Sequence, residues 1–255
     1  MPDFKRIEEN DPLPAHVKDT DGNILNYEEI RVRFICEQIF QTRILNSDRP
    51  DLYAENKQFG IEVTSANDIP CTIHRHVDGE LKAQQINYNH LEGMKYKEMR
   101  QNGTINEELC FASMNANADI YIKVIMKALE SKLKKLNGEN GEAYTEYPVQ
   151  FLYITSIIDT LSLSINDFMK LFQHMCHIQK KFTKFFALIF IECIDCLIKF
   201  DFVTGRAYFM PNIFELIPGE NMRARAYVIA KHNGEKAPDS PAEALRMLID
   251  ITEHS

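Results

Sequence analysis

The chain has 255 residues, of which 45% are hydrophobic and 26% are charged, and its formal net charge at pH 7 is -8. This length can bury a large core, and the composition is that of a globular, enzyme-sized domain rather than of a disordered chain. The acidic balance argues against a dedicated nonspecific DNA-binding protein, because neutralising phosphates normally requires a concentrated basic surface.

Three parts of the chain are expected: an N-terminal extension over residues 1–26, an α/β core over residues 27–210, and a C-terminal extension over residues 211–255. A short helix is predicted in the last part, because Ser240-Pro241-Ala242-Glu243 is a capping-box sequence with proline at the first helical position. No apolar run has the length that spans a bilayer, and the first residues do not form a signal peptide. We therefore expect a cytoplasmic protein without a membrane partner.

The first predicted element is a helix over residues 27–45, with Asn26 as its N-cap and Glu29 three residues later. Glu37 and Gln41 fall in the middle of the apolar stripe of this helix, where a charged side chain is costly without a partner. We therefore expect Glu37 to point toward the acidic face of the strands that follow.

Two short strands are predicted next, over residues 51–55 and 59–65, joined by a two-residue turn. Successive side chains of a strand point to opposite faces, so Asp51, Glu62 and Thr64 share one face and apolar residues form the other. This register places Asp51 opposite Glu62, with the two side chains about 5 Å apart.

The closeness of these two carboxylates indicates a metal site. Like charges directly opposed destabilise a sheet unless something positive lies between them. A hard divalent cation with oxygen ligands is the usual solution, so Asp51 and Glu62 are candidate metal ligands.

The polar residues 67–79 are interpreted as a loop or an active-site rim, and an amphipathic helix is predicted over residues 84–101. A further helix is predicted over residues 117–136. Lys132 lies near the centre of the apolar face of the 117–136 helix, and Lys135 lies at its edge. The other lysines project to the solvated side: Lys123, Lys127 and Lys134. If the Lys132 ammonium points inward, its charge can complement the two acids. The alternative is that the Lys132 side chain extends along the helix surface and places its ammonium in solvent.

The remaining elements complete a central sheet flanked by helices. Strands are predicted over residues 149–157, 185–192, 197–202 and 207–210, with a helix over residues 164–181 between the first two.

Other ligand patterns are weaker. The six cysteines fit neither a disulfide framework nor a zinc site, because the single CxxC, Cys193 to Cys196, lacks a second pair. We expect reduced, mostly buried thiols. Two histidine pairs lack a third ligand at motif spacing: His74 with His76, and His174 with His177.

The Pro50-Asp51 strand followed by Gly60-Ile61-Glu62-Val63-Thr64 resembles the PD-(D/E)xK, or restriction-endonuclease-like, nuclease superfamily over roughly residues 27–200. The resemblance implies a core with a central mixed sheet flanked by helices. It also implies that Asp51 and Glu62 hold one or two Mg²⁺ or Mn²⁺ ions, that the Val63 carbonyl can add a ligand, and that Glu37 corresponds to an additional helix glutamate.

Thr64 departs from the family, because it stands where the family has a lysine that orients or activates the attacking water. Related variants move this lysine to the following helix, and Lys132 is the corresponding candidate here. A threonine hydroxyl can hydrogen-bond the water but cannot replace an ammonium group electrostatically.

The implied activity is metal-assisted hydrolysis of phosphodiester bonds, in which the cation polarises a phosphoryl oxygen and Lys132 stabilises developing negative charge. The implied partner is nucleic acid, DNA in preference to RNA, and many relatives act as homodimers. The alternative is a nuclease-derived fold that has lost catalysis and serves as a binding or assembly protein. Thr64 favours that alternative.

Overall fold

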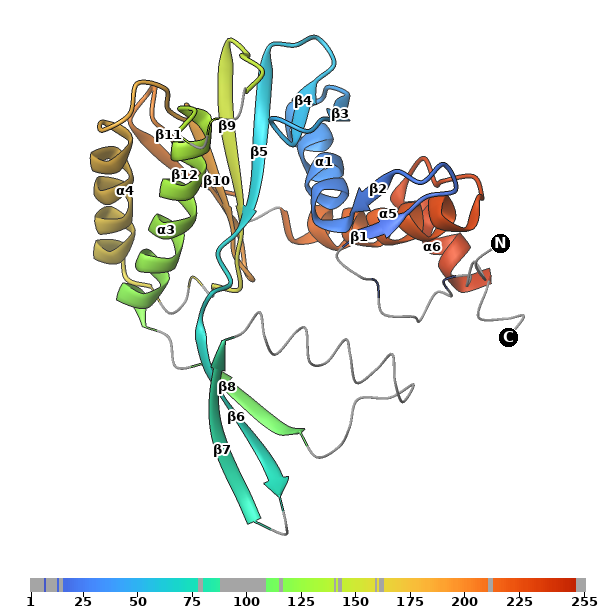
Figure 1. The fold of residues 1–255 in the computed structure, drawn as a ribbon, viewed down its shortest axis with the longest axis horizontal. Helices are drawn as coiled ribbons and strands as arrows, with labels where there is room; N and C mark the ends of the chain where they lie inside the picture. Colours follow the sequence, from blue (N-terminus) through green and yellow to red (C-terminus); the bar gives the residue numbers. More distant parts are fainter. Residues whose placement is uncertain are drawn as a thin grey trace. The chain divides into compact units, whose positions relative to one another are not determined.

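The computed structural model describes residues 7, 13, 16–77, 80–87, 109–114, 117–139, 141, 144–158, 160, 163–210 and 213–250 (Figure 1). The chain forms two compact units: Met1–Gln58 with Asn212–Ser255, and Phe59–Pro211. This grouping differs from the division expected at residues 26 and 210, since the C-terminal segment packs with the N-terminal part of the chain.

The second unit contains five strands of a mixed sheet, in the order β12-β11-β10-β9-β5. Strands β5, β9 and β10 are parallel to one another, and the remaining pairings are antiparallel. The protein is therefore of the α/β class with a mixed sheet. The bounds are β5 Phe59–Ser65, β9 Val149–Thr155, β10 Leu188–Glu192, β11 Leu197–Asp201 and β12 Arg206–Met210.

Two helices lie side by side on one face of these strands: α3 (Ala118–Leu136) and α4 (Ile165–Gln179) (Figure 1). Their apolar stripes and the inward residues of β9 and β10 form one hydrophobic cluster, which includes Leu129, Leu133, Leu152 and Ile154. Burial of these large side chains is the main stabilising contribution to this layer. The starts of both helices were predicted to within one or two residues.

Residues 67–79 were expected to form a loop, and this expectation is wrong for residues 70–77. Those residues form the middle strand of a separate antiparallel sheet, in the order β7-β6-β8, while residues 67–69 are irregular as expected and residues 78 and 79 lie outside the described residues. The bounds are β6 Pro70–Val77, β7 Glu80–Asn87 and β8 Leu109–Met114. Residues 84–87 are consequently strand rather than helix, and the rest of the helix predicted over residues 84–101 lies outside the described residues.

In the first unit, helix α1 (Tyr27–Phe40) begins as predicted, since the Asn26 side chain accepts a hydrogen bond from the Glu28 N–H and donates one to Glu29. The helix ends five residues earlier than predicted. Gln41 adopts a left-handed conformation with φ 49°, and the chain continues into strand β3 (Ile44–Asn46). A left-handed residue of this kind commonly ends a helix.

The other elements of the first unit are β1 (His16–Lys18), β2 (Ile24–Asn26), β4 (Leu52–Ala54), α5 (Ile213–Asn233) and α6 (Pro241–Asp250). Helix α6 begins at the predicted proline. Helix α5 packs against α1 through a buried cluster that includes Ile30, Phe34, Ala224 and Val228.

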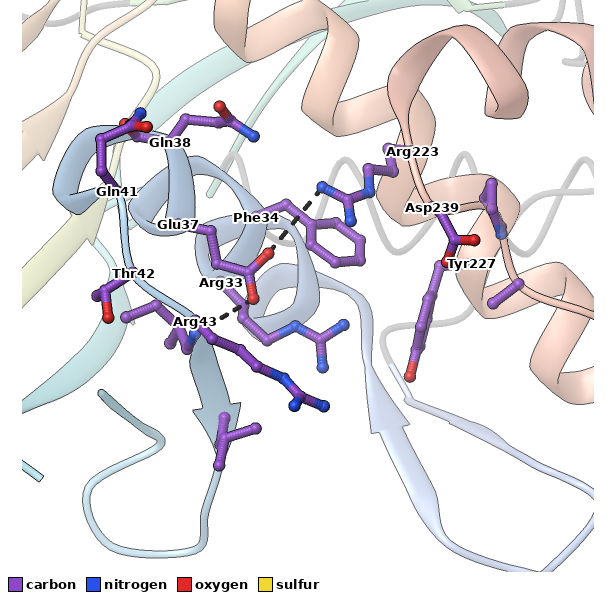
Figure 2. Close-up of a pocket in the computed structure, with 14 residues that line it drawn as sticks. Arg33, Phe34, Glu37, Gln38, Gln41, Thr42, Arg43, Arg223, Tyr227 and Asp239 are labelled. Atoms are coloured by element: carbon purple, nitrogen blue, oxygen red, sulfur yellow. Dashed lines mark hydrogen bonds and ion pairs between the residues drawn. The ribbon is translucent and has the colours of Figure 1, made fainter. Parts of the chain in front are cut away.

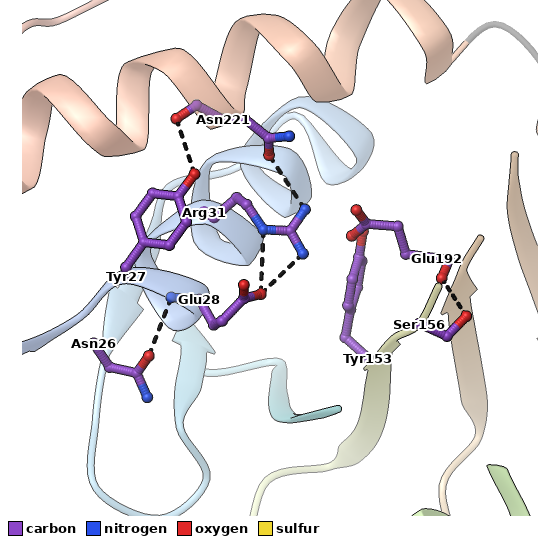
Figure 3. A network of polar contacts seen from close by, with 8 residues as sticks. All are labelled: Asn26, Tyr27, Glu28, Arg31, Tyr153, Ser156, Glu192 and Asn221. Atoms are coloured by element: carbon purple, nitrogen blue, oxygen red, sulfur yellow. Dashed lines mark hydrogen bonds and ion pairs between the residues drawn. The ribbon is translucent and has the colours of Figure 1, made fainter. Parts of the chain in front are cut away.

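A polar network also joins α1 to α5 (Figure 3). The buried Arg31 guanidinium donates to the Glu28 carboxylate at 3.0 and 3.2 Å and to the Asn221 side-chain oxygen at 3.2 Å. The Tyr27 hydroxyl lies 3.4 Å from the Asn221 carbonyl, to which it donates. A buried charge is tolerated only when it is paired and hydrogen-bonded, and these contacts meet that need for Arg31.

Within the described part of the chain, no helix has both the length and the apolarity needed to cross a membrane.

Candidate active site

Strand β5 directs Glu62 toward helix α3. The parallel register pairs Glu62 with Leu152 and Thr64 with Ile154, so these four side chains share one face of the sheet. Leu152 and Ile154 belong to the hydrophobic cluster that α3 covers. Glu62 is therefore an acid inside an apolar layer, with 4% of its surface exposed.

Helix α3 supplies the cation that Glu62 needs. Lys132 Nζ lies 2.5 Å from Glu62 Oε1, and the two side chains are only 12% and 5% exposed. Three other lysines of the helix, Lys123, Lys127 and Lys134, are exposed as predicted. The Lys132 stem thus does not extend to solvent. A carboxylate this buried requires a partner, because desolvation of an unpaired ion costs several kcal/mol.

Thr64 and Val63 follow Glu62 on the same strand. Thr64 is half-buried on the Glu62 face. The Val63 side chain is buried and points to the opposite face. The alternation of β5 is therefore as the sequence predicted.

Asp51 belongs to the first unit and lies, half-buried, one residue before β4. Its backbone carbonyl accepts a hydrogen bond from the Ser47 N–H at 2.8 Å. Strand β4 ends at Ala54 and β5 begins at Phe59, so the connection has four residues rather than the two expected. The separation of Asp51 from Glu62 remains a prediction.

Glu37 also belongs to the first unit, where it has its own partners. Its Oε1 accepts a hydrogen bond from the Ile44 N–H at 3.2 Å, and its Oε2 lies 4.0 Å from an Arg223 Nη1. These contacts account for a half-buried carboxylate on the apolar side of α1. The orientation of Glu37 toward the acids of the strands remains a prediction.

The donors near Glu62 suit Mg²⁺ or Mn²⁺ better than a transition metal such as zinc. Among the described residues, no group of three or more histidine, cysteine, aspartate or glutamate side chains could hold a metal ion. Zinc sites need three or four such ligands, whereas Mg²⁺ commonly binds one or two carboxylates and keeps several waters. The Glu62 carboxylate and the Val63 carbonyl are hard oxygen donors, which are the ligands that Mg²⁺ prefers.

The other candidate ligands form no metal centre in the described part of the chain. Cys193 and Cys196 are free and buried thiols. The hydrogen bond between them, together with burial, raises the pKa of Cys193, and the same hydrogen bond lowers the pKa of Cys196. Cys36 and Cys176 are free as well, as predicted, while the side chains of Cys71 and Cys110 lie outside the described part.

A second buried acid, Glu192, lies on the opposite face of the sheet and was not predicted from the sequence. The Tyr153 hydroxyl donates to Glu192 Oε2 at 2.8 Å, and the Ser156 hydroxyl donates to the Glu192 carbonyl at 2.8 Å (Figure 3). Glu192 is the last residue of β10. The sequence feature that could have indicated it is a glutamate at the end of an apolar strand. A charged residue at that position is also common where a strand simply ends at the protein surface.

Replacing Tyr153 by Phe is expected to lower the free energy of unfolding by about 2 kcal/mol, because the buried Glu192 carboxylate loses a donor. Urea denaturation measures the effect. Tyr208→Phe is the matched control, since Tyr208 is 38% exposed on β12. Equal unfolding midpoints for the two variants would contradict a stabilising role for the Tyr153 hydroxyl.

Comparison of the chain with models of protein families, with curated proteins and with solved structures finds no match.

Proposed function

We propose that the protein is a metal-dependent nuclease with a restriction-endonuclease-like core. The contact between Lys132 and Glu62 carries the proposal. The family's lysine is absent from position 64, and the chain supplies a lysine from the following helix to the same glutamate. Glu62 on β5 and the inward Lys132 on α3 together reproduce the family's combination of acid and cation.

The ion pair suits hydrolysis of a phosphodiester. Charge builds on the phosphoryl oxygens as the bond to the leaving oxygen breaks, and a fixed cation in a water-poor site stabilises that charge without reorganising. Lys132 is fixed in this way, since its Nζ is hydrogen-bonded and its stem is packed. Thr64, on the same face, has a hydroxyl that can orient a water.

Glu62, the Val63 carbonyl and Asp51 would hold Mg²⁺ or Mn²⁺. When bound, such an ion polarises a phosphoryl oxygen and lowers the pKa of a coordinated water. Glu62 has two roles in this arrangement, because it offers oxygens to the ion and holds Lys132 beside the reacting phosphate. Glu37 is the auxiliary acid of the proposal.

Nucleic acid is the proposed substrate, with DNA preferred to RNA, and a homodimer is the proposed assembly for cutting two strands. The net charge of -8 disfavours broad electrostatic binding of nucleic acid. Contacts are therefore expected to be local, through the metal ion and the exposed lysines of α3 and α4, Lys123, Lys127 and Lys170.

Cleavage of single- and double-stranded DNA and RNA in Mg²⁺, Mn²⁺ or EDTA tests the proposal. We expect cleavage in either metal and none in EDTA. Glu62→Gln keeps the shape of the side chain, and it is expected to slow cleavage about 10²- to 10³-fold or more, the usual effect of removing one electrostatic contact to a transition state. Glu139→Gln, at an exposed glutamate that follows α3, is the matched control.

A second candidate function follows from Thr64: a nuclease-derived fold that binds nucleic acid or protein without cleaving. In that case Lys132 and Glu62 form only a stabilising pair. No cleavage of any substrate in either metal by pure, folded protein supports this candidate. Cleavage that Glu62→Gln leaves unchanged contradicts the site itself.

A further inference from the structure

A cavity of about 570 Å³ lies in the first unit, between α1, α5 and the segment that joins α5 to α6 (Figure 2). Its size is within the range of small-molecule sites. The charged residues that line it are three arginines and two acids: Arg33, Arg43, Arg223, Glu37 and Asp239. Glu37, the auxiliary acid of the proposed nuclease, also lines this cavity, whereas Asp51, Glu62, Thr64 and Lys132 do not.

Two of the three arginines have carboxylate partners. Arg223 lies 3.4 Å from the buried Glu220 and 4.0 Å from Glu37. Arg43 lies 3.1 Å from Glu55, and both of these side chains are more than half exposed. Their charges are therefore largely balanced within the unit.

Arg33 is different. Its Nη1 donates to the neutral Asn46 side-chain oxygen at 2.7 Å, and no carboxylate of the described residues forms an ion pair with it. Its Nε is buried without an acceptor in the described part of the chain. A half-buried cation without a counter-ion is costly, and an anion in the cavity would offset that cost.

Aromatic rings hold this guanidinium in place. The Arg33 Cζ lies 4.6 Å from the Phe34 ring centroid and 5.0 Å from the Tyr227 ring centroid. The Arg223 Cζ lies 3.9 Å from the same Phe34 ring. Cation–π contacts at these distances are favourable, and they fix two positive groups beside one cavity. A site that is organised before binding loses less entropy when a ligand arrives.

The arrangement suits a phosphate group. A guanidinium offers a planar fork of donors that matches phosphate oxygens, and its charge is permanent. Tyr227 also lines the cavity, and its hydroxyl is a potential further donor. The cavity volume exceeds that of a phosphate ion, and Gln38 and Gln41 line it with amides that can pair with a polar organic group.

We propose that this cavity binds a phosphomonoester of nucleotide size, with its phosphate at Arg33 and Tyr227. The phosphomonoester belongs either to a free nucleotide or to the phosphorylated end of a strand. This site goes beyond the proposed nuclease activity and does not require it.

Isothermal titration of the full chain in EDTA tests the site, because EDTA removes any metal-dependent binding at Glu62. The probes are AMP, adenosine, inorganic phosphate, and a single-stranded hexanucleotide with a 5′-phosphate or a 5′-hydroxyl. AMP binding with no adenosine binding identifies the free nucleotide as the source. Binding of the phosphorylated hexanucleotide, with no binding of its 5′-hydroxyl form or of AMP, identifies the strand end.

Arg33→Gln is expected to weaken binding of the preferred probe roughly 10- to 100-fold, the effect of losing a charged hydrogen bond. Arg206→Gln, at an exposed arginine of β12 in the other unit, is expected to leave affinity unchanged. Tyr227→Phe removes only a hydroxyl and is expected to weaken binding roughly 3- to 10-fold, so the site remains testable if Arg33→Gln does not fold.

The site would be overturned if no phosphorylated probe binds, or if inorganic phosphate is the only probe that binds. It would also be overturned if AMP binds no more tightly than adenosine and the phosphorylated hexanucleotide no more tightly than its 5′-hydroxyl form. Unchanged affinity in both Arg33→Gln and Tyr227→Phe would overturn it as well. Loss of nuclease activity in Glu62→Gln leaves this binding intact, which keeps the two proposals separable.

Discussion

Replacing Lys132 by Met is expected to lower the free energy of unfolding by roughly 3–5 kcal/mol, the usual cost of removing one member of a buried ion pair. Methionine keeps most of the apolar stem, so the loss comes from leaving the Glu62 carboxylate, whose side chain is 5% exposed, without this cation. Urea or thermal denaturation measures the change. The matched control is Lys134→Met on the same helix, where the lysine is 45% exposed and a change within about 0.5 kcal/mol is expected.

The double variant Lys132→Met with Glu62→Leu separates stability from catalysis. Replacing both members of a buried ion pair by apolar residues is often neutral, so most of the lost stability should return. Cleavage should not return, because neither the acid nor the cation is present. A Lys132→Met variant as stable as Lys134→Met would show that the pair is not a buried, stabilising contact.

Replacing Leu152 by Ala is expected to lower the free energy of unfolding by about 2–5 kcal/mol, through lost burial and a residual cavity. Leu152 is fully buried, pairs with Glu62 across β5 and β9, and belongs to the cluster that α3 covers. A cavity there should also loosen the seating of α3, and therefore weaken cleavage.

Met169→Ala is the control for this variant, since Met169 lies on α4 with 51% of its surface exposed. Its unfolding midpoint should stay close to that of the native chain. If Leu152→Ala unfolds at the same denaturant concentration as Met169→Ala, the layer between β9 and α3 is not the stabilising core described above.

The inward lysine could be predicted because helical periodicity is strict. On α3 the apolar positions define one face, and Lys132 falls within it while Lys123, Lys127 and Lys134 do not. Strands β9 and β10 were predicted for a similar reason. Because β9 and β10 are parallel central strands that are covered on both faces, their sequences are nearly continuous apolar runs, and such runs predict buried strands.

The polar strand β6 could not be predicted from local pattern. Its residues are too polar and too weakly alternating to indicate a strand, and what makes it one is pairing on both sides, with β7 and with β8. The pairing with β8 joins residues far apart in the sequence, such as Cys71 and Met114, which a local sequence window does not contain.

Helix α5 was not predicted because of its composition. Pro218 and Gly219 lie inside it, and both residues are unfavourable in helix interiors. Packing against α1 overrides that preference. The cavity with Arg33 and Arg223 was missed for the same reason, since it exists only where α5 meets α1.

Cleavage of double-stranded DNA in Mg²⁺ by the native chain, Lys132→Met and Lys134→Met tests the proposed nuclease most directly, at a temperature where all three are folded. We predict metal-dependent cleavage by the native chain and by Lys134→Met, with loss of cleavage in Lys132→Met. Equal cleavage by the two variants, or no cleavage by the native chain, would contradict a catalytic role for Lys132.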